Sequence, residues 1–155
     1  MAEARTWILT GSPENHAATA QRGYALIGCK ERRRRQAEQM EPGDRIVLFA
    51  TRVLAFAASV RLTSGMFEDR TPVWPRTGRA DQYPWRFHAE PELVLDEPDW
   101  LPAEALRFDL DHIRKWPAEH WTLAFQGQLR TVSDHDAQVL LDAMSARAGS
   151  RAPVP

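Results

Sequence analysis

The sequence predicts an α+β fold, a distorted mixed β-barrel of about five to six strands flanked by short helices. Strand-like segments follow one another without the regular strand–helix alternation of a doubly wound sheet, so we expect mostly consecutive, hairpin-linked strands. Residues 45–50 and 53–63 are close enough to pair as one such hairpin. At 155 residues the chain has the length of one domain that buries a core without disulfides or metals.

The N-terminal part predicts a strand, a capped helix and a second strand. Residues 5–10 are rich in aromatic and β-branched types, which favour a strand that ends at Gly11. Ser12 followed by Pro13 is typical of a helix start, because the serine hydroxyl caps the helix and the proline lacks an N–H where none is needed. We expect about two turns of helix, ending near residue 22, and a strand over residues 23–28.

The middle of the chain predicts most of the remaining sheet. A polar, helix-prone stretch over residues 30–40 leads to a turn at residues 41–44, with Pro and Gly in type II order. The hairpin of residues 45–63 comes next, followed by a loop rich in aromatic residues. Residues 86–95 form another strand, in which Pro91 marks a break or an edge.

The C-terminal part predicts short helices, a last strand and a longer helix. Short helices are expected near residues 102–106 and 111–115, and a strand over residues 128–132. Ser133 caps the final helix, with Asp136 in the reciprocal capping position. Four apolar residues share one face of that helix: Val139, Leu140, Ala143 and Met144. We assign one domain to residues 1–148 and expect a disordered tail over residues 149–155.

Composition places the chain among ordinary globular domains. The single cysteine, Cys29, has no partner for an internal disulfide, which favours a reducing cytoplasm. No apolar run is long enough to cross a bilayer, and the N-terminus lacks a signal-peptide layout, so we expect no membrane partner.

Charge is unevenly distributed along the chain. Residues 1–89 hold 14 basic and 9 acidic side chains, a net charge of +5. Residues 90–155 hold 6 and 12, a net charge of −6. Such asymmetry indicates either a basic face for an anionic polymer or two halves that neutralise each other in the fold.

The sequence offers no catalytic residue and no metal or cofactor site. The five histidines do not stand at zinc-site spacing, and a single cysteine excludes the usual cysteine clusters. We find no glycine-rich phosphate loop and no nucleophile elbow. Cys29 is expected to be an inert packed residue, although a nucleophile beside a histidine is an alternative, and the aspartates of residues 96–111 are expected to form an acidic surface.

Three segments carry chemistry suited to a nucleobase. Residues 74–87 hold four aromatic rings and three arginines, which provide stacking faces and paired hydrogen bonds; burial of these rings in a core is the alternative. The turn of residues 11–15 combines a helix N-terminus with the amide of Asn15. The run Arg32, Arg33, Arg34 and Arg35 suits backbone phosphates or a solvated face, and no more than two of its members can face one way.

Five segments, in order, resemble the EVE domain family, single-domain proteins of the PUA-like superfamily that are related in fold to YTH domains. They are residues 7–15, 27–32, 42–49, 72–74 and 83–87. The resemblance runs from about residue 5 to about residue 142, and no one motif is highly specific. It implies a PUA-like distorted β-barrel with a pocket for a flipped-out modified base of DNA or RNA.

The resemblance also implies which residues line that pocket. The matching positions are Ser12, Pro13, Asn15, Gly28, Cys29, Lys30, Trp74, Tyr83, Pro84 and Arg86. Two positions depart from the usual pattern: His16 stands where the family commonly has Trp, and Cys29 where Val is usual. His16 would make a smaller, titratable wall, so the choice of ligand is expected to differ.

These observations predict a non-enzymatic domain that recognises a modified base, such as a methylated cytosine or adenine, in an aromatic pocket. Trp74 and Tyr83 would supply stacking faces, Ser12 and Asn15 would read the base edge, and Lys30, the arginine run and Arg86 would hold phosphate. The alternatives are a hydrolase acting on RNA or nucleosides on a PUA-like barrel and a small-molecule-binding module.

Overall fold

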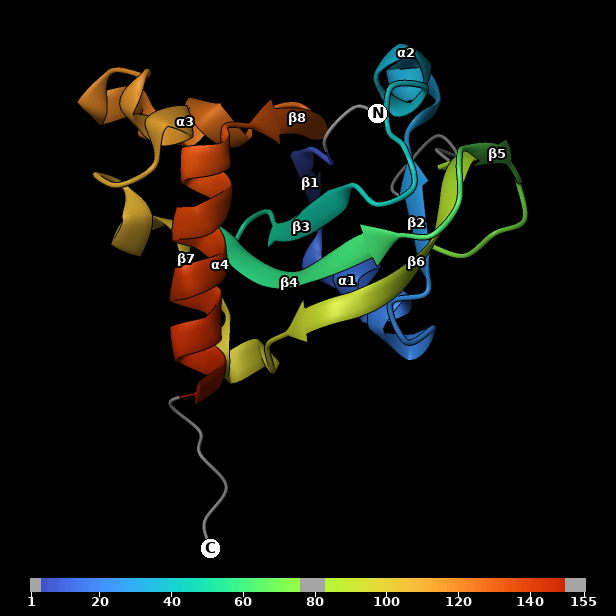
Figure 1. Ribbon diagram of the computed structural model, residues 1–155, viewed down its shortest axis with the longest axis horizontal. Coiled ribbons are helices and arrows are strands. Elements are labelled where there is room, and N and C mark those ends of the chain that lie inside the picture. Colours follow the sequence, from blue (N-terminus) through green and yellow to red (C-terminus); the bar gives the residue numbers. More distant parts are fainter. Residues whose placement is uncertain (1–3, 76–82, 150–155) are drawn as a thin grey trace, which may run out of the picture.

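A computed structural model describes residues 4–75 and 83–149 and has the predicted α+β architecture, a mixed sheet curled into a half-barrel with short helices around it (Figure 1). The strand order in the sheet is β2-β6-β4-β3-β1-β8. These strands are β1 (Thr6–Gly11), β2 (Leu26–Cys29), β3 (Arg45–Ala50), β4 (Ala55–Leu62), β6 (Trp85–Val94) and β8 (Leu129–Val132). Two short strands that the sequence did not predict extend it: β5 (Phe67–Glu68) pairs with β6, and β7 (Leu101–Pro102) with β4.

Strand connectivity differs from the consecutive hairpins that the sequence predicts. The predicted hairpin is present, because β3 and β4 pair antiparallel. However, β1 pairs in parallel with β3, from Thr6 opposite Arg45 to Gly11 opposite Ala50. A parallel pair needs a crossover, and here the chain supplies it through α1 (Pro13–Gln21) and β2, which joins the other end of the sheet beside β6. Pro91 lies next to an irregularity in the pairing of β6 with β4, as its lack of an N–H requires.

The predicted helices are present at the expected places. In addition to α1, they are η1 (Glu31–Arg33), α2 (Arg34–Ala37), η3 (Ala103–Leu106), α3 (Asp111–Arg114) and α4 (Asp134–Gly149). Two further short helices that the sequence did not predict are η2 (Glu97–Asp99) and η4 (Ala118–Phe125). In Figure 1, α4 stands beside one end of the sheet, close to α3 and β7. Gly149 is the last residue of α4, and the rest of the predicted tail, residues 150–155, lies outside the described residues.

The core consists of two clusters on opposite faces of β3, which follows from the alternation of side chains along a strand. Ile46 and Leu48 point into the barrel, where they join Trp7, Ile27 and Phe87. Val47 and Phe49 point to the other face and pack in the cluster that contains the fully buried Leu140 and Met144 of α4. The predicted apolar face of α4 is therefore confirmed, with Val139 and Ala143 at its partly buried margin.

Two aspartates hold the fold together through backbone and indole donors. Asp44, which follows Gly43 at a φ of 93°, accepts hydrogen bonds from the Trp7 indole and the Arg5 backbone N–H, each at 3.0 Å. Ser133 caps α4, since its hydroxyl accepts from the Asp136 N–H. The reciprocal bond predicted for Asp136 is wrong, because its carboxylate instead accepts the backbone N–H groups of Asp111 and His112, each at 2.8 Å, and so caps α3.

No helix in the described part of the chain is long and apolar enough to span a membrane.

Candidate functional site

Three segments far apart in the sequence meet at two adjoining cavities. They are the β1–α1 turn, β2 with the residue after it, and the ends of the segment between β5 and β6. The inner cavity has a volume of about 30 Å³, and the outer cavity one of about 450 Å³. Thr10, Gly11, Asn15 and Tyr83 line both cavities, so they stand at the junction between the two.

The indole of Trp74 forms one wall of the inner cavity and is held tightly. Its Nε1 donates to the Thr19 hydroxyl at 2.9 Å, and the side chain is only 8% exposed. A Cβ atom placed on Gly28 would stand 2.6 Å from Cη2 and Cζ3 of the indole, so Trp74 rests directly on the glycine backbone. Gly28 is therefore needed for its lack of a side chain.

Tyr83 closes the junction between the cavities. Its ring meets Trp74 edge to face, with centroids 5.6 Å apart and an interplanar angle of 68°. Asn15 Nδ2 donates to the Tyr83 hydroxyl at 2.9 Å, whereas the buried Asn15 Oδ1 has no hydrogen-bond partner among the described residues. Tyr83 has a φ of 49°, a left-handed conformation that non-glycine residues adopt only when their surroundings hold it.

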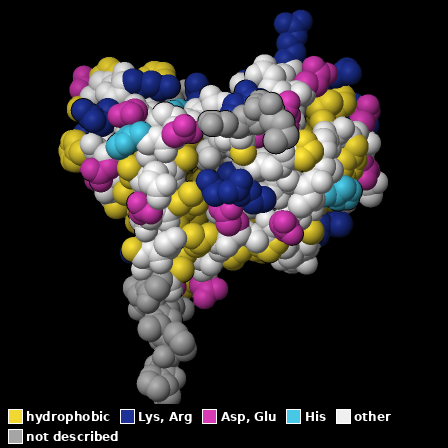
Figure 2. Space-filling model, in the orientation of Figure 1, with side chains coloured by type: hydrophobic (Ala, Val, Ile, Leu, Met, Phe, Trp, Pro, Cys, Tyr) yellow, Lys and Arg dark blue, Asp and Glu magenta, His cyan; other side chains and the backbone are white. Residues whose placement is uncertain are grey.

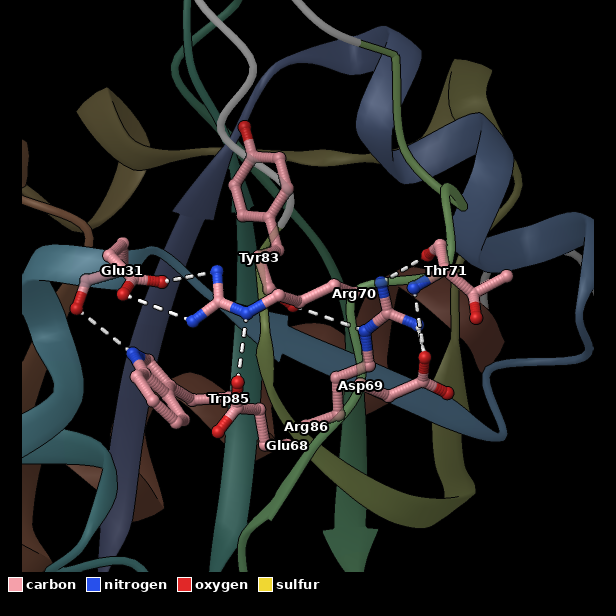
Figure 3. A network of polar contacts seen from close by, with 8 residues as sticks. All are labelled: Glu31, Glu68, Asp69, Arg70, Thr71, Tyr83, Trp85 and Arg86. Carbon is pink, nitrogen blue, oxygen red and sulfur yellow. Dashed lines mark hydrogen bonds and ion pairs between the residues drawn. The ribbon is translucent and has the colours of Figure 1, made fainter.

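Arg86 holds Tyr83 in this left-handed conformation, and its side chain is buried. Its Nε donates to the Tyr83 carbonyl at 3.1 Å, its Nη2 donates to the Thr71 carbonyl, and its Nη1 lies 3.5 Å from Asp69 (Figure 3). The guanidinium also stacks on Trp74, with Cζ 5.2 Å from the ring centroid. Because the side chain is 1% exposed, the predicted phosphate contact is corrected: Arg86 positions Trp74 and Tyr83 from behind the cavity.

A second arginine beside this network belongs to the surface. Arg70 forms ion pairs with Glu31 and Glu68, and its guanidinium lies over the Trp85 ring (Figure 3). The Trp85 indole donates to the Glu31 carbonyl and packs in the barrel interior. Trp85 and Phe87 therefore pack in the core. Among residues 83–87, only Tyr83 lines the cavities.

Ser12, Pro13 and Lys30, three of the predicted pocket residues, differ in how close they lie to the cavities. The Ser12 hydroxyl accepts the Asn15 backbone N–H at 3.2 Å and caps α1, so it borders the outer cavity with its capping bond already made. Pro13 begins α1 and is not among the described residues that line either cavity. Lys30 lines the outer cavity and makes no ion pair within the described part of the chain.

Two further predicted residues lie behind the site. Cys29 is fully buried in the barrel core, and burial raises the pKa of its thiol to about 12. Its predicted place in the pocket is corrected: the side chain packs in the barrel core and is not among the described residues that line either cavity. Pro84 is buried and its carbonyl accepts the Asp69 N–H at 2.9 Å, so it anchors the entry to β6.

The four arginines of residues 32–35 divide among different environments. Arg32 and Arg35 are exposed and form no ion pair within the described ranges. Arg34 pairs with Glu38 and lies over the Trp85 ring, whereas Arg33 is half-buried and turns toward the loop that precedes β8. The run therefore does not form one cationic face. This agrees with the prediction from helix geometry that no more than two of the four arginines can point the same way.

The uneven charge of the two halves of the sequence is partly neutralised by the fold. Glu92, from the acidic half, pairs with Arg45 and Arg61 from the basic half, each at 2.6 Å. On the face shown in Figure 2, basic and acidic side chains are interspersed and do not gather by sign. The molecule therefore presents no extended basic surface on that face.

His16 is buried at the inner cavity. Its Nε2 donates to the Phe49 carbonyl at 2.9 Å, since a carbonyl only accepts, and its ring meets Trp100 edge to face. Burial lowers the pKa of His16 below its ordinary value, so the side chain is a neutral wall of the cavity. The pKa of His112, which is buried beside Phe125, is lowered for the same reason.

The two buried histidines predict that acid destabilises the protein. Below pH about 6.5 these histidines are protonated in the unfolded chain but stay neutral in the folded chain, because burial lowers their pKa values. As the pH decreases from about 6.5 to the lowered pKa, the free energy of unfolding therefore falls by up to about 1.4 kcal/mol per pH unit for each histidine. Thermal unfolding at pH 7.5 and 5.5 measures this fall. His16→Gln is expected to reduce this fall, and a pH dependence equal to that of the wild type would contradict the assignment.

Sequence reasoning missed several residues that line the cavities. Thr10, Thr19 and Gln128 stand on separate elements and carry no motif of their own. Gln128 Oε1 accepts the Lys30 backbone N–H at 2.7 Å, which joins the β8 loop to the end of β2. The apolar floor comes from Leu9, Ile27 and Leu48, which read as ordinary strand residues. Their common position results from the curl of the sheet, which no local pattern predicts.

No protein-family model and no curated protein matches the chain, whereas solved structures do. The Mmi1 YTH domain in complex with RNA is similar with a TM-score of 0.68 at 10% identity, over 96% of this chain and 82% of that one. The YTH domain of Zygosaccharomyces rouxii MRB1 protein in complex with N6-methyladenosine RNA has a TM-score of 0.63 at 10% identity, over 93% and 88%.

A hypothetical protein from Leishmania major has a TM-score of 0.63 at 12% identity, over 94% of this chain and 98% of that one. At such low identity these likenesses concern the fold alone. The half-barrel with its surrounding helices is a YTH-like α+β fold.

Proposed function

We propose that this chain is a non-enzymatic nucleic-acid-binding domain of the EVE type that takes a modified base into the outer cavity. The observation that carries the proposal is the edge-to-face pair of Trp74, which lines the inner cavity, and Tyr83, which lines both cavities. The YTH-like fold supports it, since similar structures of that fold hold RNA and, in one case, N6-methyladenosine RNA.

The sizes of the two cavities suit a base that carries a small substituent. The outer cavity, at about 450 Å³, is within the range of ligand pockets. The inner cavity, at about 30 Å³, holds one small group, and Leu9, Ile27 and Leu48 make its floor apolar. A methyl group on the base enters the inner cavity, and its burial favours the modified base by about 0.8 kcal/mol, roughly fourfold.

The polar groups at the junction suit the edge of a base. Asn15 Nδ2 is engaged with the Tyr83 hydroxyl, which leaves the buried Oδ1 to accept an N–H from the ligand. A buried acceptor without a partner costs roughly 1–3 kcal/mol, and a ligand that supplies the donor recovers that cost. Lys30 at the rim adds a cation for the backbone of the nucleic acid.

The titratable groups of the cavities favour binding over catalysis. His16 is neutral and engaged with a backbone carbonyl. Glu14 pairs with Arg52, and the hydrogen bond from that arginine lowers the pKa of Glu14, which keeps the carboxylate ionised. Lys30, at the rim of the outer cavity, forms no ion pair with a carboxylate in the described part of the chain. It therefore has no acidic partner there with which to exchange a proton.

Titration of fluorescent single-stranded oligonucleotides tests the proposal, with the base methylated in one series and unmodified in the other, and RNA and DNA compared. Wild-type protein is expected to bind the methylated series several-fold more tightly and to return every oligonucleotide chemically unchanged by mass spectrometry. Equal affinity for both series would contradict base reading, and turnover would favour the hydrolase alternative.

Tyr83→Ala is expected to lower the affinity for the methylated oligonucleotide by roughly 5- to 150-fold, because one stacking ring contributes about 1–3 kcal/mol. Tyr83 is only partly buried and does not belong to either core cluster, so the domain is expected to remain folded. Phe108→Ala, which removes an aromatic ring that is 77% exposed and lines neither cavity, is the matched control. An equal loss of affinity in the two variants would contradict a stacking role for Tyr83.

A further inference from the structure

We propose that Arg33 and Arg130 form an anion site over Gly127 that holds one backbone phosphate next to the nucleotide whose base enters the outer cavity. The two arginines come from η1 and β8, almost a hundred residues apart in the sequence. A Cβ atom placed on Gly127 would stand 3.2 Å from Arg33 Nη2 and 3.5 Å from Arg130 Nη2. Both guanidinium groups therefore border the same small volume.

The two cations lack a carboxylate partner within the described part of the chain. Neither forms an ion pair there, which sets them apart from Arg34, Arg45 and Arg70. Arg130 Nε donates to the Gln126 carbonyl, at 2.9 Å. Two neighbouring positive charges without a counter-ion repel each other, and an anion shared between them removes that cost.

Arg33 is a half-buried cation whose guanidinium is incompletely hydrogen-bonded. Its Nε is buried and has no hydrogen-bond partner among the described residues, and its hydrogen bond from Nη1 to Gln36 Oε1 is long at 3.5 Å. A half-buried guanidinium with an unpaired N–H is costly unless its charge is compensated. An anion on the outer edge of the same guanidinium provides that compensation.

Gly127 allows both guanidinium groups to approach the backbone closely. Its φ of 83° is in the left-handed region, and the absence of a side chain lets the two groups converge over it. Any Cβ atom there would crowd Arg33 Nη2. A glycine with two convergent arginines is the geometry expected for close approach of a phosphate oxygen.

The loop that carries the site is hydrogen-bonded to residues that line the cavities. The Gly127 carbonyl accepts the Thr10 hydroxyl at 3.1 Å, and Thr10 lines both cavities. The neighbouring Gln128 lines the inner cavity and accepts from the backbone of Lys30, which lines the outer one. A chain whose base occupies the outer cavity therefore passes this loop, and a phosphodiester is the anion that it brings. The inference rests on the proposed function for that identity.

The first experiment measures the salt dependence of oligonucleotide affinity for Arg33→Gln, Arg130→Gln and the double variant. Because both arginines hold one phosphate, each change is expected to lower affinity three- to tenfold and to reduce the slope of log K against log salt by up to about 0.7. The double variant is expected to lose about 0.7 in total, and a loss near 1.4 would assign the arginines to separate phosphates and overturn the shared site. The ratio of methylated to unmodified affinity stays at the wild-type value.

Two controls keep the result specific. Arg35→Gln removes an exposed cation from the same run and is expected to change the slope by less than either site variant; an equal change would mean general electrostatics and overturn the proposal. Arg33→Lys preserves the charge without the planar fork and is expected to retain most of the slope. It also shows whether loss in Arg33→Gln comes from charge or from misfolding, which circular dichroism checks for every variant.

A second experiment separates this site from the proposed function. Inorganic phosphate, titrated at constant ionic strength and followed by NMR, is expected to shift the Gly127 amide in the wild type and not in the double variant. A shift without methylated-base preference would retain the anion site and reject the base reader. No shift at Gly127, or an unchanged oligonucleotide slope in the variants, would overturn the phosphate site whatever the base preference.

Discussion

Gly28→Ala is expected to destroy the proposed recognition site while leaving every polar and aromatic side chain that lines the cavities in the chain. The added Cβ would lie 2.6 Å from two atoms of the Trp74 ring and 3.0 Å from Tyr83 Cβ, so the indole must move. Trp74 is buried and bonded to Thr19, and the inner cavity that it lines is the space into which the indole can shift. Overpacking of this kind costs roughly 1–3 kcal/mol, and we expect the melting temperature to fall by about 2–4 °C per kcal/mol.

Binding should suffer more than stability in this variant. A displaced indole fills the inner cavity, so the preference for a methylated base is expected to disappear and the affinity to fall at least tenfold. Thermal unfolding and oligonucleotide titration measure the two effects separately. Gly65→Ala is the matched control, because a Cβ there meets nothing within 4 Å and the same substitution leaves the cavities untouched. A Gly28→Ala protein with wild-type base preference would contradict the contact of Trp74 with Gly28.

Arg86→Met is expected to destabilise the protein more than Gly28→Ala does. The substitution keeps the aliphatic bulk but leaves the carbonyls of Thr71 and Tyr83 without their donor and removes the cation stacked on Trp74. Loss of one partner in a buried charged network costs roughly 3–5 kcal/mol, or roughly 6–20 °C in melting temperature. Tyr83, whose φ of 49° depends on that bond, is expected to leave the junction, so affinity falls as well.

The outcome distinguishes two roles for Arg86. If the guanidinium contacted phosphate, as the sequence predicts, Arg86→Met would reduce the salt dependence of binding by about 0.7 and leave the melting temperature unchanged. The matched control is Arg70→Met, the neighbouring arginine in Figure 3, whose ion pairs with Glu31 and Glu68 are exposed and contribute little to stability. Equal melting temperatures for the two variants would contradict the positioning role.

The sequence predicted the local elements of this chain well, because their signals are local. Ser12 and Pro13 start α1, Ser133 caps α4, and alternation along residues 45–50 separates the two core clusters. Asn15, Gly28, Trp74 and Tyr83, which the family resemblance assigns to one pocket, all line the inner cavity, and their role in binding stays a prediction. The EVE family assignment, the modified base and the cytoplasmic location stay predictions.

Only the tertiary structure decided what the side chains within those segments do. Cys29 and Arg86 are neighbours of pocket residues in sequence, yet Cys29 packs in the barrel core beside Trp85, and Arg86 lies behind Trp74, where it bonds the Tyr83 and Thr71 carbonyls. Arg33 and Arg130 meet because the curl of the sheet brings the segment after β2 against β8, where Lys30 and Gln36 bond to Gln128 and Leu129. A residue type specifies which contacts are chemically available, whereas sheet register and curl determine which neighbours are within reach, and those depend on pairings between segments that are remote in the sequence.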